Sequence, residues 1–169
     1  ARGGRLDFDT TRRRRSFEDI IRCFETQNLD IMVGTQMIAK GLDFSNVGLV
    51  AVLNADNLLN FTDFRVEENA FQTLVQISGR AGRRQAGRVM IQTYSPDSEL
   101  MKCVAANDFE RFFNVQMQER HIFRYPPYCR MTTITLKHRD NNLLTRASDY
   151  LADSLRNNEI FEVLGTESP

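Results

Sequence analysis

The sequence predicts an α/β protein in which short strands alternate with helices around a parallel sheet. Short apolar runs recur between segments with helical periodicity, which is the pattern of βαβ units. Glycine and proline residues mark several of the boundaries between these segments. The 169 residues suffice for one domain, or for one domain and part of a second.

The first βαβ unit is expected at the start of the chain. Leu6–Asp9 predicts a short strand that ends in a polar turn. Ser16 then predicts a helix start, because its side chain can cap the first turn. The apolar residues that follow share one helical face: Phe17, Ile20, Ile21 and Phe24.

Further strands and a helix complete the predicted sheet. Ile31–Val33 indicates a short buried strand, and Val47–Asn54 is so continuously apolar that we expect a strand covered on both faces. A helix is expected over Val66–Gln76, with Gly79–Gly82 closing it. Arg88–Tyr94 is rich in β-branched and apolar residues and predicts the next strand.

The pattern changes after Pro96. Asp97–Arg120 predicts mostly helix, and the prolines in Arg124–Tyr128 break it. A strand over Met131–Lys137, an amphipathic helix over Leu143–Leu155 and a strand starting at Phe161–Leu164 are then expected.

This change predicts three parts. Residues 1–96 form the α/β lobe, residues 97–121 form a helical connection, and residues 122–169 form the truncated start of a smaller α+β domain.

Composition excludes several classes of protein. Lysine and arginine total 22 and aspartate and glutamate total 22, so the chain is not a polycation held to nucleic acid by bulk charge alone. No apolar stretch approaches the roughly 18 residues of a membrane span, and no signal peptide is visible. The three cysteines are widely spaced, so we expect reduced thiols in a cytoplasmic protein rather than disulfides or a zinc site within this chain.

The segment Gln76-Ile77-Ser78-Gly79-Arg80-Ala81-Gly82-Arg83 carries candidate chemistry. Arg80 and Arg83 are three residues apart, so their guanidinium groups suit a polyanion such as a terminal phosphate. The alternative is a solvated helix end whose positive charges complement the helix dipole.

A second candidate segment, GTQMIAKGLDF (Gly34–Phe44), directly follows a predicted buried strand. Thr35 would place a hydroxyl group and free N–H groups where anions bind. Gly41 allows a tight turn beside Asp43, whose carboxylate can accept from a ribose hydroxyl. The alternative is a simple βα turn in which Thr35 caps a helix.

Several other residues have two possible interpretations. The run Arg12–Arg15, with Arg12 and Arg13 as candidate DNA contacts, could bind backbone phosphates or form a solvated loop. Aromatic residues could stack on bases or pack within the protein: these are Phe61, Phe64, Phe71, Tyr125 and Tyr128. His121 and His138 have no partners at metal-ligand spacing and receive no role.

Together these stretches resemble the primosomal protein N′ family of bacterial replication-restart helicases, which belong to superfamily 2. The two segments above are typical of superfamily 2 in general. LNADNLLNFTDFR (Leu53–Arg65) and RYPPYCR (Arg124–Arg130) narrow the resemblance to this family, and RLDFDTTRRR (Arg5–Arg14) also fits. The resemblance covers essentially the whole chain.

The resemblance implies a fold and an activity. The chain would hold the later part of the second RecA-like helicase lobe and the start of the C-terminal domain. The activity would be ATP- and Mg²⁺-dependent 3′–5′ DNA unwinding at stalled forks and D-loops. The implied partners are forked or single-stranded DNA, replication-restart primosome proteins and single-strand-binding protein, with no membrane.

The resemblance also implies residue roles. Thr35 would contact the single-strand backbone, Arg83 would be the arginine finger, and Arg80 would lie beside it on the γ-phosphate. Four residues would lie at the nucleotide: Gly41, Asp43, Gln76 and Gly79.

Several parts of the family pattern are absent from this sequence. It contains no G-x-x-x-x-G-K-[ST] P-loop and no D-E-x-H stretch for the magnesium ion. The paired zinc cysteines of the family are also absent. We therefore expect a piece of a larger protein that cannot hydrolyse ATP by itself.

Two other functions stay open at this point. A non-catalytic RecA-like module could bind DNA or a replication protein while keeping the helicase motifs only as scaffold. A translocase could move on DNA without separating strands.

Overall fold

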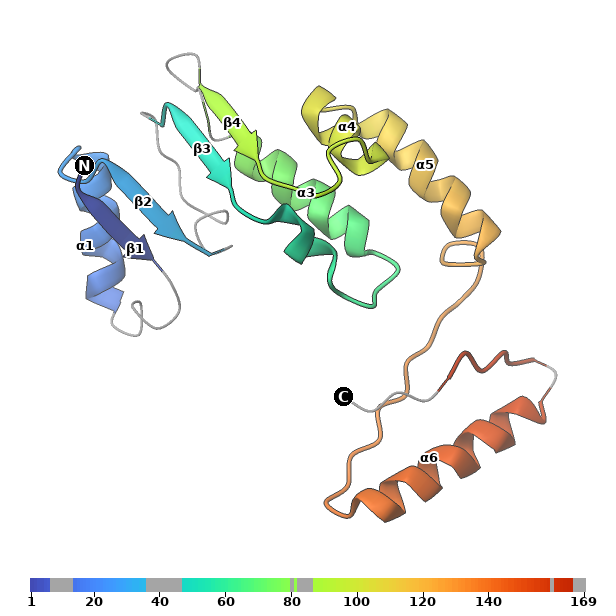
Figure 1. Cartoon of the computed structure of the whole chain (residues 1–169). Helices are drawn as coiled ribbons and strands as arrows, with labels where there is room; N and C mark the ends of the chain where they lie inside the picture. The colour runs from blue at the N-terminus through green and yellow to red at the C-terminus, as the bar shows by residue number, and fades with distance from the viewer. Residues whose placement is uncertain (7–13, 36–46, 80, 82–86, 159, 166–169) are drawn as a thin grey trace. The chain divides into compact units, whose positions relative to one another are not determined.

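The computed structural model describes residues 1–6, 14–35, 47–79, 81, 87–158 and 160–165 (Figure 1). The chain divides into two compact units, Ala1–Tyr128 and Cys129–Pro169. The parallel βαβ pattern predicted from the sequence is confirmed in the first unit, as two small parallel sheets. The three-part division of the chain stays a prediction.

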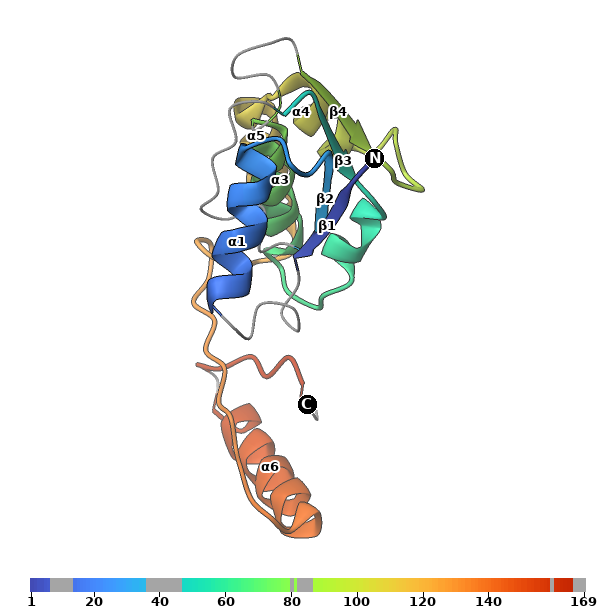
Figure 2. The same cartoon turned by 90° about the vertical axis from the view of Figure 1, so that its left-hand side faces the viewer.

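The first βαβ unit consists of β1 (Gly3–Leu6), α1 (Arg14–Glu25) and β2 (Ile31–Gly34). The two strands run parallel and α1 packs against β1 (Figure 2). Gly4 lets the turn after α1 approach β1 closely, because a Cβ atom there would lie 2.7 Å from Leu29 Cδ1 and 3.4 Å from Ile20 Cγ2 of α1. A larger residue would therefore push the Leu29 side chain away from β1.

The second βαβ unit contains β3 (Leu49–Val52), the 3₁₀ helix η1 (Ala55–Leu59), α3 (Val66–Ser78) and β4 (Arg88–Ile91). β3 and β4 are parallel, with each residue of β3 opposite one of β4 in an unbroken register (Figure 1). Val52 and Ile91 pack against the hydrophobic core cluster, which includes residues of α3. The predicted helix from Val66 is confirmed and extends two residues further, to Ser78.

Two more helices complete the core of this unit, α4 (Glu99–Ala106) and α5 (Phe109–Ile122). They confirm the mostly helical segment predicted after Pro96, and Asn107 separates them with a left-handed φ of 52°. The Ser98 and Asp108 side chains cap their first turns. The buried core lies between η1, α3, α4 and α5 and contains Ala55, Ala70, Phe71, Leu74, Leu100, Met101, Cys103, Val104 and Phe112.

The second unit contains α6 (Asn141–Arg156), which confirms the predicted amphipathic helix. The Asp140 side chain caps it by accepting from the backbone N–H groups of Asn142 and Leu143. The strands expected over Met131–Lys137 and Phe161–Leu164 are wrong: both segments lack strand structure. A strand needs a hydrogen-bonded neighbour, and neither segment pairs with another in the described part of the chain.

Two details of the first unit also differ from the prediction. β1 lies at Gly3–Leu6 rather than Leu6–Asp9, and residues 7–9 fall outside the described residues. Helix α1 begins at Arg14, so Ser16 lies within its first turn rather than at the residue before it. Arginine is a good helix former, which explains the earlier start.

The expectation of a strand covered on both faces is also wrong for β3. Val50 and Val52 are half-buried, but Leu49 and Ala51 are exposed. Within the described part of the chain, β3 packs on the core cluster through one face. A strand buried on one face needs apolar residues only at alternate positions, whereas β3 is apolar at every position. No helix in the described part is long and apolar enough to cross a membrane.

Candidate functional site

Three of the predicted site residues lie within the described structure. Thr35 directly follows the carboxyl end of β2 and is exposed. Gln76 is exposed in the last turn of α3, and Gly79 ends that helix. The others lie outside the described residues: Arg12, Arg13, Gly41, Asp43, Arg80 and Arg83.

The end of α3 directly precedes the segment that contains Arg80 and Arg83. The Gly79 N–H donates to Val75 O at 2.9 Å, and its φ of −66° is ordinary right-handed helix. A Cβ atom at Gly79 would lie 3.5 Å from Val75 O, which is normal van der Waals contact. The helix therefore ends at Gly79 without needing the conformational freedom of glycine.

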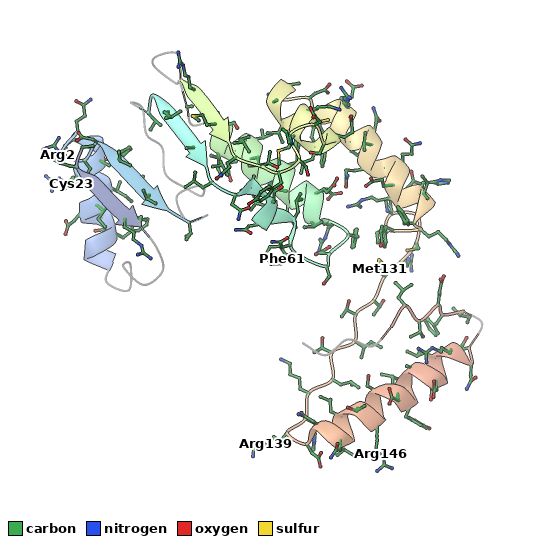
Figure 3. The ribbon with its side chains drawn as sticks, in the orientation of Figure 1. Arg2, Cys23, Phe61, Met131, Arg139 and Arg146 are labelled. Carbon is green, nitrogen blue, oxygen red and sulfur yellow. The ribbon has the colours of Figure 1, made fainter. Side chains whose placement is uncertain are left out.

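A groove of about 700 Å³ lies along α3 beside the loop that follows η1. Gln76 lines it at the helix end, and Phe61 lines it from the loop. Figure 3 marks the position of Phe61. The groove connects a predicted nucleotide-binding residue with the Leu53–Arg65 stretch, a connection that the sequence did not predict.

The amino-terminal end of α3 is held by a junction that sequence reasoning missed. Arg120 of α5 pairs with the carboxylate of Glu68 and donates from Nη1 to Pro126 O at 2.6 Å. Its guanidinium lies 4.9 Å from the centre of the Phe64 ring. Phe64 in turn stacks on Tyr125 with ring centroids 5.4 Å apart. We call Phe64, Glu68, Arg120 and Tyr125 the Arg120 junction.

The structure decides between stacking on bases and packing within the protein for several aromatic residues. Phe64 and Tyr125 pack on each other within the protein. Phe71 is buried and stacks on Phe112 with centroids 4.2 Å apart. Phe61 keeps 67% of its surface exposed, so among the three candidate phenylalanines it alone presents an open face.

Asp56 explains part of the Leu53–Arg65 stretch. Its Oδ1 accepts from Thr93 Oγ1 at 2.9 Å, and its Oδ2 accepts from the Tyr94 N–H at 3.1 Å. The carboxylate thus ties η1 to the chain leaving β4.

A carboxylate with a raised pKa lies beside the Arg120 junction. Burial raises the pKa of Glu67, and the nearby Glu119 carboxylate raises it further. Gln116 Nε2 donates to Glu67 Oε2 at 2.8 Å and to Glu119 Oε2 at 3.3 Å, which partly offsets the effect on Glu67. The buried Gln116 amide therefore joins two acidic groups of α3 and α5.

We expect Glu67→Gln to stabilise the chain at about pH 7 by up to about 1 kcal/mol, and to have little effect at about pH 3. Because the pKa of Glu67 is raised in the folded protein, ionisation of this carboxyl group opposes folding. The loss of stability is absent below the pKa of the unfolded state and complete above the pKa of the folded state. Urea unfolding at both pH values measures it. Glu99→Gln is the control with opposite sign, because Arg111 lowers the pKa of Glu99. An equal gain at both pH values would contradict this account of Glu67.

The described residues contain no group of three or more histidine, cysteine or acidic side chains that could hold a metal ion. His121 meets Tyr128 edge to face, and His138 Nδ1 accepts from the Asp140 N–H at 3.0 Å. Both histidines thus have local structural contacts.

Comparison with known proteins assigns the chain to a family. Residues 2–85 match the family model described as "Helicase conserved C-terminal domain". The replication restart protein PriA of Bacillus subtilis is 42% identical over 159 residues, which is 94% of this chain and 20% of that protein. The PriA proteins of Synechocystis and Haemophilus influenzae are 44% and 36% identical over 73% and 92% of the chain, and over 15% and 22% of their own lengths. The chain therefore spans about a fifth of the length of these relatives, and it belongs to the PriA family of replication restart proteins.

Proposed function

We propose that this chain is part of the second RecA-like motor lobe of an ATP-dependent 3′–5′ DNA helicase that acts in replication restart. The observation that carries the proposal is the similarity to PriA proteins over most of the chain, together with the helicase domain at residues 2–85. The parallel βαβ units and the helix leading into Arg80 and Arg83 support it.

In the proposed mechanism, α3 positions the segment whose arginines contact the nucleotide. The Arg120 junction holds one end of this 13-residue helix, and Gly79 ends it directly before Arg80. Arg83 would stabilise the charge that grows on the transferring phosphoryl group, with Arg80 beside it. Gly41, Asp43, Gln76 and Gly79 would line the nucleotide.

ATP and Mg²⁺ would be held mainly by another part of the protein, since this chain contains no P-loop. We accordingly propose that the chain alone does not hydrolyse ATP. Thr35, exposed after β2, would contact the DNA backbone, and closing and reopening of the two lobes would shift this contact along the strand. The proposed partners are forked or single-stranded DNA, primosome proteins and single-strand-binding protein.

Unwinding by the full-length protein tests this proposal against its two alternatives. We expect DNA-stimulated ATP hydrolysis and unwinding of a duplex with a 3′ single-stranded tail, with a matched 5′-tailed duplex as the control for direction. ATP hydrolysis without unwinding would favour a translocase. Absence of DNA-stimulated hydrolysis would overturn the motor proposal in favour of a non-catalytic binding module.

A further inference from the structure

The groove along α3 has a lining unlike that of a phosphate site. Three uncharged amides line it from the exposed face of the helix, at Asn69, Gln72 and Gln76. The lining also includes the half-buried Leu58 and the buried Ala70. Gln76 lies ten residues after Val66, so this wall extends over about 15 Å of helix.

Charge in the groove argues against recognition of a phosphate. Within the described residues, no lysine or arginine lines it. Its single acidic residue, Asp63, is engaged locally: Oδ1 accepts from the Arg65 N–H at 2.9 Å and lies 3.6 Å from Arg65 Nε. The described part of the lining therefore suits an uncharged group with hydrogen-bonding edges.

Phe61 adds an open aromatic face to this lining. The ring lies on the loop between η1 and α3 and is 67% exposed (Figure 3). Phe64 and Phe71, the neighbouring candidates, are instead stacked on other rings of the protein. An exposed aromatic ring beside a groove offers a face on which a planar ligand can stack.

We propose that this groove binds a nucleobase, which stacks on Phe61 and forms hydrogen bonds with Asn69 and Gln72. An amide presents a donor and an acceptor in one plane, which fits the edge of a base. Every base has a flat face that can stack on an aromatic ring. The volume of the groove also lies in the range that is typical of ligand-binding sites. That the base comes from single-stranded DNA rests on the proposed function.

The absence of tryptophan from the chain provides a direct test. Phe61→Trp introduces a single tryptophan at the groove, and its fluorescence reports stacking. The matched control is Tyr150→Trp, at a residue of α6 that is 77% exposed. The probes are an oligodeoxyadenylate, an abasic oligomer of equal length and adenosine monophosphate.

We expect the oligodeoxyadenylate to quench Phe61→Trp with saturation, while the abasic oligomer does not and Tyr150→Trp responds to neither. Adding Gln72→Ala to Phe61→Trp should weaken this quenching about fivefold, the effect of losing one hydrogen bond. Quenching by adenosine monophosphate alone would also support the base site and would assign it to a free nucleotide.

Fluorescence anisotropy of a labelled oligodeoxyadenylate separates this proposal from the proposed function. Binding by anisotropy without quenching overturns the groove as a base site and leaves DNA binding intact. Equal quenching by the abasic oligomer overturns it too, because the contact would then be to the backbone. Absence of both signals overturns the groove together with DNA binding by this chain.

Discussion

Arg83→Ala in the full-length protein is expected to lower DNA-stimulated ATP turnover by about a hundredfold or more, while DNA binding stays nearly unchanged. An arginine that neutralises charge on the transferring phosphoryl group acts in the transition state, and such residues contribute about 10³–10⁵ in rate. Its effect should therefore fall on kcat rather than on the affinity for DNA. Steady-state ATPase assays with and without DNA, and anisotropy with labelled DNA, measure the two quantities.

The matched control is Arg146→Ala, because Arg146 is an exposed arginine of α6 (Figure 3). We expect this variant to hydrolyse ATP at the wild-type rate. Circular dichroism of both variants checks that the fold is retained. Wild-type turnover by Arg83→Ala would remove Arg83 from the proposed mechanism and leave the motor proposal standing.

Local patterns predicted the fold class and most helices because each depends on nearby residues. The helix from Val66 follows from its apolar spacing, and the parallel strands follow from the alternation of β3, α3 and β4. The strands expected at Met131–Lys137 and Phe161–Leu164 were wrong because a strand depends on a partner far away in the sequence. Alternating apolar residues record a preference for extended backbone, but they do not supply that partner.

The candidate site shows the same division between local and distant information. The motif residues Gln76 and Gly79 follow from a short sequence, and the structure places both at the end of α3. The Arg120 junction joins residues 52 positions apart, so no local spacing reveals it. A charged residue inside a helix usually predicts a solvated face, whereas Arg120 keeps only 14% of its side chain exposed.

The Arg120 junction also gives a structural role to the stretches on which the family resemblance depended. Phe64 comes from Leu53–Arg65, and Tyr125 and Pro126 come from Arg124–Arg130. These two stretches meet around one guanidinium group. Two of the candidate base-stacking residues therefore hold the helix that precedes Arg80 and Arg83, the arginines proposed to bind phosphate.

We expect Arg120→Ala to lower the free energy of unfolding by about 1–3 kcal/mol, because it leaves the Glu68 carboxylate without this partner and removes a cation over Phe64. Urea unfolding measures the loss. Glu68 is 36% exposed, so water compensates in part and the loss stays below that of a fully buried pair.

Arg111→Ala is the matched control on the same helix. Arg111 pairs with Glu99 at 2.7 Å, but both side chains are about half exposed (53% and 45%), so we expect a clearly smaller loss than for Arg120→Ala. Arg120→Lys should fall between the two, because lysine keeps the charge but lacks the planar fork that reaches both Glu68 and Pro126 O. Equal losses for Arg120→Ala and Arg111→Ala would show that burial adds nothing at the junction. Apolar packing would then hold the amino-terminal end of α3. The position of the helix that precedes Arg83 would not depend on the ion pair between Arg120 of α5 and Glu68 of α3.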